Sequence, residues 1–251
     1  MGGLAAAGAA AAPESKRVVG GTEADPADWP SVAALAVRGT QFCGASVIAP
    51  KAVLTAGHCV VGHDFAFRVI TQRYDLTTGD GQSIKAKRVF VHPDYRRAGK
   101  HDLAVVRLRR ETNAPTIPLA TEAEDQIETA PGAKLRVAGW GDTEPDGQSA
   151  SDVLMTTPQN VIAAHACRQA FAAFRPKSEI CTRGDPVSGD GYTSSCYGDS
   201  GGPLVADPAA GDLLVGVVSY GGRRCGVRKP SVYARVADGL HFIRNRAGLS
   251  P

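Results

Sequence analysis

Short apolar runs separated by turn-forming residues occupy most of the chain from residue 31 onward. Each run holds Val, Ile, Leu or aromatic residues, and Gly, Pro, Asp or Asn stands between one run and the next. Runs of this length and composition are typical of β-strands rather than of helices. The pattern predicts twelve strands, at about 31–38, 42–50, 53–59, 65–72, 85–93, 102–110, 134–141, 152–162, 179–183, 201–206, 213–221 and 231–236.

The predicted strands form two sets of six on either side of segment 111–133, which holds three prolines and several acidic residues. Because proline cannot donate to a strand ladder, this segment is a natural boundary. We therefore expect an all-β fold of two six-stranded antiparallel β-barrels, one formed by 18–120 and the other by 121–251. Helix is expected only in the Ala-rich segment 163–174 and in a short C-terminal helix near 237–247.

Length and charge limit the classes of function. The chain has 251 residues and a formal net charge of +3, which is enough length for a substantial core and too little charge to indicate nucleic-acid binding. No run of Lys or Arg could follow phosphates, and the basic pairs at 223–224 and 228–229 are interpreted as solvated loop residues, with steering of an acidic substrate as the alternative. An apolar stretch of about 18 residues, the length of a membrane span, is absent. We therefore expect neither a nucleic-acid nor a membrane partner.

Six cysteines, an even number, indicate an oxidising compartment and a set of disulfides. Neither a C-x-x-C pair nor an H-E-x-x-H motif is present to indicate zinc, and Asp75 and Asp80 are too few carboxylates for a calcium loop. We therefore expect no metal and no cofactor. Six cysteines permit about fifteen connectivities, and each disulfide contributes on the order of 2–4 kcal/mol to stability.

The first residues differ in composition from the rest of the chain. Residues 1–13 are Ala-rich and apolar but lack the basic start and the length of a full secretory signal. Because disulfides require export, we interpret 1–17 as a signal remnant followed by a short pro-segment ending at Lys16 and Arg17. An expression artefact is the alternative. The protein is expected to be secreted.

Three segments carry candidate chemistry, in the order histidine, aspartate, serine. Residues 55–59 are Thr-Ala-Gly-His-Cys, residues 102–106 are Asp-Leu-Ala-Val-Val, and residues 198–203 are Gly-Asp-Ser-Gly-Gly-Pro. A serine hydroxyl is a poor nucleophile at neutral pH, so it needs an imidazole that accepts its proton and a carboxylate that orients the imidazole. These segments contain all three groups and predict acyl-transfer chemistry.

The three segments, in this order, resemble those of the chymotrypsin-like (trypsin-like) secreted serine endopeptidases, and the resemblance covers about 17–246. It implies that Ser200 is the nucleophile, that His58 is the general base and acid, and that Asp102 orients His58. The backbone N–H groups of Gly198 and Ser200 would form the oxyanion hole. With His58 and Asp102 in the first barrel and Ser200 in the second, the active site would lie in the cleft between the barrels.

The same resemblance implies an activation step and a disulfide pattern. Cleavage after Arg17 would free Val18 as a new amino terminus, and its ammonium would insert beside the Asp199 carboxylate. The chain is therefore expected to be a zymogen, with an activating protease and protein inhibitors as partners beside its protein or peptide substrates, and to be a monomer. The disulfide pairs implied are Cys43–Cys59, Cys167–Cys181 and Cys196–Cys225.

The residues expected at the primary specificity pocket differ from those of a trypsin-type pocket. Ser194 occupies the floor position, where a trypsin-type pocket has Asp, and Ser231 stands where the family usually has Gly. One wall is expected from Ser219, Tyr220 and Gly221, which should pair with the substrate backbone. A pocket without a buried carboxylate cannot offset the desolvation of Lys or Arg. We therefore expect cleavage after Phe, Tyr, Leu or Met, with smaller aliphatic residues as the alternative if Ser231 limits the depth.

Two alternative hypotheses compete with this one. The Ser200 motif also matches G-x-S-x-G, the nucleophile elbow of α/β-hydrolase esterases, and His241 follows it with Asp212 or Asp238 between them. An elbow leads into a helix, however, whereas Pro203 and the apolar pair after it favour a turn and then a strand. The second hypothesis is a catalytically silent family member that acts as a binding or regulatory module, which the complete set of three residue types disfavours.

The remaining histidines have no catalytic context in the sequence, and a lone histidine is more often structural than catalytic. Gly57, where the family usually has Ala, is interpreted as a harmless exchange because both residues are small. Surface or packing roles are assigned to His63, His92, His101, His165 and His241.

Overall fold

The structure of the chain is a computed structural model. The expected cleavage residue Arg17, the expected leader 1–17 and His63 lie outside its described residues. Among those residues, no helix has the length and apolarity that crossing a membrane requires. The residues described are 18–62, 67–98, 100–187, 189, 191–207 and 211–250.

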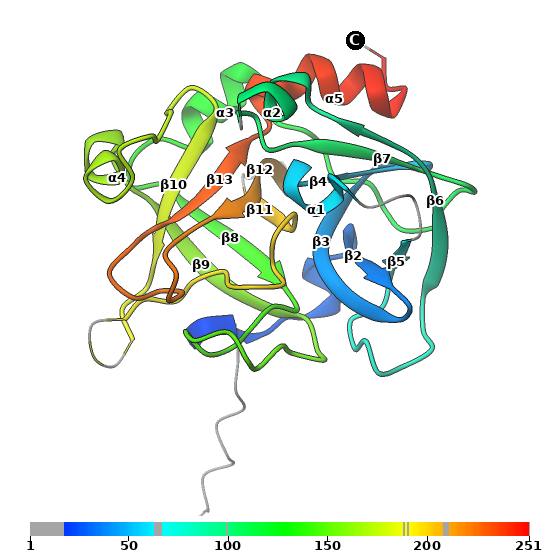
Figure 1. Ribbon diagram of the computed structural model, residues 1–251, viewed down its shortest axis with the longest axis horizontal. Helices are drawn as coiled ribbons and strands as arrows, with labels where there is room; N and C mark the ends of the chain where they lie inside the picture. The colour runs from blue at the N-terminus through cyan, green and yellow to red at the C-terminus, as the bar shows by residue number, and fades with distance from the viewer. Residues whose placement is uncertain are drawn as a thin grey trace, which may run out of the picture.

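Six antiparallel strands close into the first barrel, which lies beside the second barrel in Figure 1. Their order around the barrel is β2-β3-β4-β7-β6-β5. The interior is filled by small and branched side chains, and Leu35, Val53, Leu54 and Val105 have no solvent exposure. The strands are β2 (Val32–Val37), β3 (Thr40–Ala49), β4 (Ala52–Thr55), β5 (Arg68–Thr71), β6 (Gln82–Val91) and β7 (Ala104–Leu108).

The second barrel is formed by the six strands of the C-terminal half. They pair in the order β8-β9-β10-β13-β12-β11, and pairing of β11 with β8 closes the ring. A short strand, β1 (Thr22–Glu23), extends the edge of β9. The two barrels confirm the predicted fold class. The strands are β8 (Lys134–Gly139), β9 (Met155–Val161), β10 (Glu179–Gly184), β11 (Pro203–Ala206), β12 (Leu213–Tyr220) and β13 (Ser231–Arg235).

Every predicted strand is present near its expected position, but the prediction for 53–59 is wrong at its end. Strand β4 stops at Thr55, and α1 (Gly57–Val60) follows and carries His58. Cys59 and Val60 are buried in the helix, so the apolar run continues across the change of structure. An apolar run of this length does not distinguish a strand from a short buried helix.

Both expected helical segments form, one as α4 (Ala164–Ala170) and the other as the turn η3 followed by α5 (Leu240–Ala247). The expectation that helix occurs only there is wrong. Helix α3 (Glu122–Glu128) begins with a capping box in which Thr121 and Glu124 cap each other, a pattern readable in the sequence. The other unexpected short helices are η1 (Val18–Gly20), η2 (Pro26–Asp28) and α2 (Pro93–Ala98), whereas η3 (Ala237–Gly239) belongs to the expected C-terminal segment.

Two disulfides join a strand to a helix and a third joins two loops, and they are the pairs that the resemblance implies. Cys43 of β3 joins Cys59 of α1, Cys167 of α4 joins Cys181 of β10, and Cys196 joins Cys225. The third disulfide ties the segment before Ser200 to the loop after β12. No cysteine in the described part of the chain is free.

Candidate active site

His58 and Asp102 meet because their strands pair. Strands β4 and β7 are antiparallel, with Thr55 opposite Ala104, so the residues just after β4 and just before β7 lie at the same end. Asp102 makes two hydrogen bonds with His58. Its Oδ2 lies 2.7 Å from the imidazole Nδ1, and its Oδ1 accepts from the His58 backbone N–H at 2.8 Å. The ring is thereby fixed with Nδ1 toward the carboxylate and Nε2 free to face the second barrel.

The second barrel also holds Asp102. The Ser219 hydroxyl donates to Asp102 Oδ2 at 2.7 Å, a contact across the two halves of the chain. The Asp102 side chain is 12% exposed, whereas His58 is 33% exposed. The Asp102 carboxylate is therefore enclosed and hydrogen-bonded to both His58 and Ser219. One edge of the imidazole stays open to a substrate. Sequence analysis assigned Ser219 only to the pocket wall.

Gly57 is not interchangeable with Ala, contrary to our expectation. A Cβ at this position would lie 2.9 Å from Cδ1 of the Tyr95 ring and 3.1 Å from Asp102 Oδ1. The Tyr95 ring thus occupies the space that an alanine methyl would need. Burial raises the pKa of the Tyr95 phenol, and the nearby Asp102 charge raises it further, which keeps this neighbour of Asp102 neutral.

The loop that carries Ser200 is held by its backbone between the two barrels. The Ser200 carbonyl accepts from the Gly44 N–H at 2.7 Å, and the Gly201 N–H donates to Val218 of β12 at 2.9 Å. Gly198 and Gly201 have φ values of +95° and +82°, a region that side chains disfavour. Glycine at these positions allows the sharp turn that presents Ser200 between the barrels.

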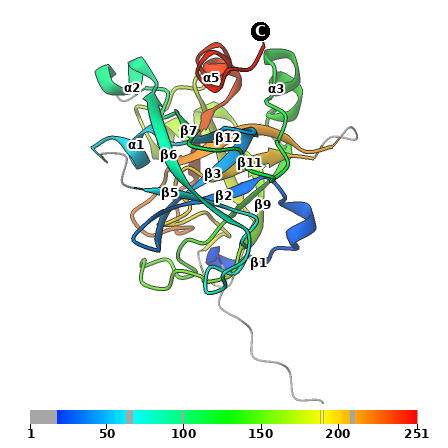
Figure 2. The same ribbon diagram turned by 90° about the vertical axis from the view of Figure 1, so that its right-hand side faces the viewer.

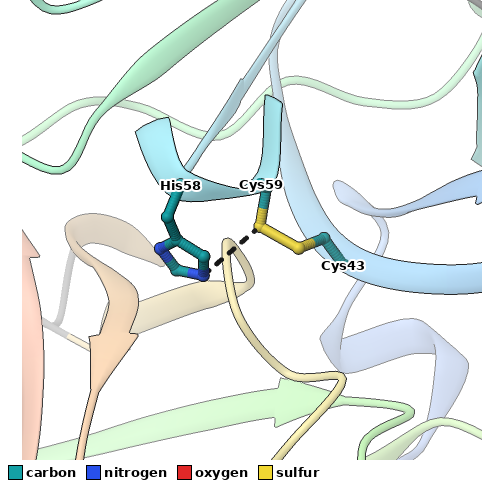
Figure 3. Close-up of side chains that lie close together, drawn as sticks. All are labelled: Cys43, His58 and Cys59. Atoms are coloured by element: carbon teal, nitrogen blue, oxygen red, sulfur yellow. Dashed lines mark hydrogen bonds between the residues drawn. A yellow bond between two sulfur atoms is a disulfide. The ribbon is translucent and has the colours of Figure 1, made fainter. Parts of the chain in front are cut away.

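The Cys43–Cys59 disulfide links His58 and the Ser200 loop spatially. Cys59 Sγ lies 3.7 Å from His58 Nε2 and 3.5 Å from the Ser200 carbonyl oxygen, so both lie against one sulfur. Figure 3 shows the imidazole beside this disulfide. Cys43, His58 and Cys59 are the one cluster of metal-type ligands among the described residues, but oxidised sulfurs are not thiolates and cannot serve as such ligands.

Among the described residues, the backbone N–H groups of Gly198 and Ser200 have no hydrogen-bond partner. The peptide planes are nevertheless fixed, because the Tyr197 carbonyl accepts from Asp142 N–H at 2.7 Å and the Asp199 carbonyl accepts from Gly202 N–H at 2.9 Å. In a trans peptide the N–H points away from the carbonyl. Both free N–H groups are therefore preset in direction. The Ser200 hydroxyl likewise makes no hydrogen bond within the described part of the chain.

Gln41, which sequence analysis did not consider, reaches this loop from the first barrel. Its side-chain Nε2 donates to the Gly198 carbonyl at 2.8 Å. The contact joins residues 157 positions apart and adds a side-chain support to the backbone contacts. No pattern in the sequence marks Gln41, because a single polar residue at the start of a strand has no periodic signal.

A cavity of about 270 Å³ opens beside Ser200 and has the expected pocket residues in its lining. At its base, Ser194 Oγ lies 2.9 Å from Ser231 Oγ and donates to the Ser195 carbonyl at 2.7 Å. Both serines are almost fully buried. The Ser194 proton is therefore used, and Ser231 is the donor of the pair. The base offers uncharged hydroxyl oxygens, and among the lining residues only Arg223 is charged.

The expected wall, Ser219 to Gly221, forms one side of this cavity. At Gly221 a Cβ would meet only the Pro230 carbonyl oxygen, at 3.7 Å, so the mouth is open. The Tyr220 hydroxyl donates to Glu179 Oε2 at 3.1 Å, and its ring packs edge-on against Phe171 with centroids 5.3 Å apart. Burial, followed by the charge of Glu179, raises the pKa of Tyr220, so this wall stays neutral.

Asp199 is fully buried beneath the Ser200 loop. Its carboxylate accepts from the Gly141 and Cys196 N–H groups, each at 2.8 Å, and within the described residues it has no cationic partner. Burial raises the pKa of Asp199 to about 7, against the opposing effect of the two hydrogen bonds. Val19, next to the expected cleavage point, lies close by: its carbonyl accepts from Ser194 N–H at 3.2 Å.

The other expected assignments have simpler outcomes. Ser200 is followed by strand β11 in a barrel, so the α/β-hydrolase alternative is wrong. His241 lies exposed in α5, and His165 lies exposed in α4. His92 and His101 pack as a stacked pair with ring centroids 4.5 Å apart, and His101 Nδ1 lies 3.2 Å from Asp238.

Two antiparallel β-barrels with a histidine, an aspartate and a Gly-Asp-Ser-Gly loop at their junction define a serine endopeptidase. The comparisons with known proteins agree. The family model Trypsin matches residues 18–243. The chain is 36% identical over 222 residues to "Trypsin" of Saccharopolyspora erythraea, with 87% of this chain and 93% of that protein covered.

Two further relatives come from animals. The chain is 32% identical over 241 residues to "Chymotrypsin-like elastase family member 1" of Homo sapiens, covering 91% of this chain and 92% of that protein. It is also 32% identical over 241 residues to "Trypsin 5G1" of Aedes aegypti, covering 94% and 86%. The chain belongs to the trypsin family.

The unpaired carboxylate of Asp199 predicts a pH dependence of stability in the uncut chain. An unfolded Asp has a pKa of about 3.9, so between that value and about 7 the folded state binds more protons than the unfolded state. The free energy of unfolding should therefore fall as pH rises from 5 to 8, by on the order of a few kcal/mol. Urea unfolding at pH 5, 6.5 and 8 measures it.

Asp199→Asn should remove this part of the pH dependence, and Asp152→Asn, a control at an exposed position, should leave it unchanged. An identical pH slope in Asp199→Asn and the parent chain would show that Asp199 is ionised without penalty.

Proposed function

We propose that the protein hydrolyses peptide bonds through an acyl-enzyme on Ser200, with His58 as general base and acid and Asp102 as the orienting carboxylate. The observation that carries this proposal is the pair of hydrogen bonds between Asp102 and His58. It leaves Nε2 as the basic nitrogen, on the side where the Ser200 loop lies. Since a serine needs such a base to attack a carbonyl at neutral pH, these three residues form one functional unit.

The chemical steps follow from this arrangement. As the Ser200 hydroxyl passes its proton to His58 Nε2, Oγ bonds to the scissile carbonyl carbon and the carbonyl oxygen becomes an oxyanion. His58 then gives the proton to the leaving amine, the C–N bond breaks and an ester on Ser200 remains. A water molecule, deprotonated by His58, hydrolyses the ester and restores the hydroxyl. Asp102 stays ionised throughout and stabilises the imidazolium.

The free N–H groups of Gly198 and Ser200 suit the oxyanion. Donors of this kind are worth roughly 3–4 kcal/mol each in a serine protease. They must be fixed before the reaction, because reorienting them during it would cost the energy they supply. We assign Gln41 and Asp142 as positioning residues. The Asp142 N–H holds the peptide that carries the Gly198 N–H, and Gln41 holds the next peptide through the Gly198 carbonyl.

The chain is a zymogen in this proposal, activated by another protease that cuts after Arg17. The cut would free Val18 as an ammonium that neutralises Asp199. Two features support this step: Asp199 is buried without a cation among the described residues, and Val19 already contacts Ser194 and packs with the Cys196–Cys225 disulfide. A buried unpaired carboxylate is costly, so pairing it would stabilise the loop. Disulfides and this activation step fit a secreted monomer that acts on proteins or peptides and is controlled by protein inhibitors.

Burst kinetics on an activated ester test the catalytic proposal. After cleavage following Arg17, the protein should release close to one equivalent of product rapidly and then turn over slowly, because deacylation of such esters is slow. Ser200→Ala should lower the rate by on the order of 10⁵-fold or more. Arg17→Gln, treated with the same activating protease, should stay inactive. An active uncut Arg17→Gln would refute only the zymogen step, whereas an active Ser200→Ala would refute the mechanism.

The pocket favours apolar or hydroxyl-bearing side chains before the scissile bond. Its base carries the Ser194–Ser231 pair and no carboxylate, so a buried Lys or Arg would remain unpaired at a cost of several kcal/mol. The free lone pairs of the serines can accept a hydrogen bond from the hydroxyl of Tyr. Phe has no such donor and would be held by its contact with the apolar part of the lining. Leu and Met fit the same space, and small aliphatic residues are the alternative if Ser231 limits the depth.

Profiling of cleavage sites in denatured proteins should give cuts after Tyr, Phe, Leu and Met. Ser194→Asp should shift cleavage toward Lys and Arg, because it places a carboxylate at the base. Ser231→Gly is the matched control: it enlarges the pocket without charge and should favour larger apolar residues. Dominant cleavage after Arg by the parent enzyme would contradict this proposal.

A further inference from the structure

A hollow of about 340 Å³ on the first barrel is lined by six basic side chains that are far apart in the sequence. We call it the basic hollow. It lies where β6, β7 and the end of α5 adjoin, and these three elements lie near one another in both Figure 1 and Figure 2. Strand β4 pairs with β7, so the turn before β4 lies beside them. The basic residues of this hollow are Lys51, Lys87, Arg88, Arg107, Arg109 and Arg246.

The basic hollow is remote from the active site. Strands β4 and β7 run between them, with Thr55 opposite Ala104 at the active-site end and Ala52 opposite Arg107 at the other. At about 3.3 Å per strand residue, the seven positions from Asp102 to Arg109 span roughly 20 Å. An occupant of the basic hollow would therefore leave the catalytic cleft open.

Almost all of this charge is unpaired. Lys51 has an ion pair with Glu111 at 3.3 Å, and both side chains are at least half exposed. The other five have no carboxylate within 4.0 Å among the residues that the structure describes. The whole chain carries a net charge of only +3, so the basic hollow concentrates positive charge that is balanced elsewhere on the molecule. Such a field favours a polyanion over a single acidic group.

Three of the four arginines of the basic hollow, Arg88, Arg107 and Arg246, make contacts within the protein. The Arg88 and Arg246 guanidinium carbons lie 4.7 Å and 5.1 Å from the centre of the Phe90 ring, and an Arg107 side-chain nitrogen donates to the Arg246 carbonyl at 3.2 Å. Preset guanidinium groups lose less entropy when they bind oxyanions. Because two guanidinium groups lie over Phe90, the ring is not available to stack a nucleic-acid base, the contact on which single-strand binding depends.

We propose that the basic hollow binds a sulfated polysaccharide chain. Sulfate groups on a flexible chain match cations contributed by β6, β7, α5, the turn before β4 and the residue after β7, and no free aromatic surface is needed. The enzyme would thus be retained on a polyanionic glycan while its cleft stays open to protein substrates.

Binding of heparin, a sulfated polysaccharide, to the full-length chain tests the proposal. Titrations at several NaCl concentrations give the affinity and its salt dependence. Lys87→Ser/Arg109→Ser removes two exposed cations of the basic hollow, and Lys134→Ser/Arg168→Ser removes two exposed cations of the second barrel as a charge-matched control. Thermal melting curves that coincide for the two variants and the parent establish that all are folded.

The hollow-directed variant should bind heparin at least tenfold more weakly at 0.1 M NaCl, with a salt slope reduced by about 2, since each lost contact releases about one fewer counterion. The control should lie within twofold of the parent, and uncharged dextran should not bind. Equal losses in the two variants, no heparin binding to the parent, or equally tight binding of a single-stranded oligonucleotide would each overturn the proposal.

Discussion

The function of this fold depends on one close approach between its two barrels, at glycines where the Ser200 loop meets the first barrel. Thr55 donates its hydroxyl to the Gly44 carbonyl at 2.8 Å, directly beneath the loop. A Cβ at Gly44 would lie 2.8 Å from Gly202 Cα, and a Cβ at Gly201 would lie 2.2 Å from Thr55 Oγ1. Side chains at these positions would force the barrels apart and separate the serine from the histidine. The glycines of the motif therefore set the distance across which a proton must pass.

This contact also explains why the loop is suited to control. The loop is fixed by backbone hydrogen bonds to both barrels, from Gly44 and to Val218. Beneath it Asp199 is buried with backbone donors alone among the described residues. Hydrogen bonds from two N–H groups do not fully replace lost hydration. A cation delivered by cleavage would remove that penalty at the position that orients the oxyanion donors. Strands β4 and β7 extend from the same junction to the basic hollow, so one strand pair carries both features.

The sequence was sufficient for the fold class, for the three disulfide pairs and for the pairing of His58 with Asp102, because those depend on strand periodicity and on motifs that agree in order. It was insufficient for contacts between residues that are far apart in the sequence and meet only in the folded chain. The contacts of Gln41 with Gly198 and of Ser219 with Asp102 arise from packing across the barrels. The basic hollow gathers residues from β6, β7, α5 and the segments beside β4 and β7. The interpretation that exchange of Gly57 for Ala is harmless was wrong, because the ring of Tyr95, a residue 38 positions away, occupies the space that an alanine methyl would need. Helix α3 was missed although its capping box is local and could have been recognised.

Labelling with a fluorophosphonate tests most directly whether an activated serine exists at this junction. Such a reagent modifies a serine hydroxyl only where a neighbouring base removes its proton. After cleavage following Arg17, the account predicts one adduct per chain, located by peptide mass spectrometry on Ser200, and its loss in His58→Ala. Adducts spread over other serines, or undiminished labelling of Ser200 in His58→Ala, would contradict it.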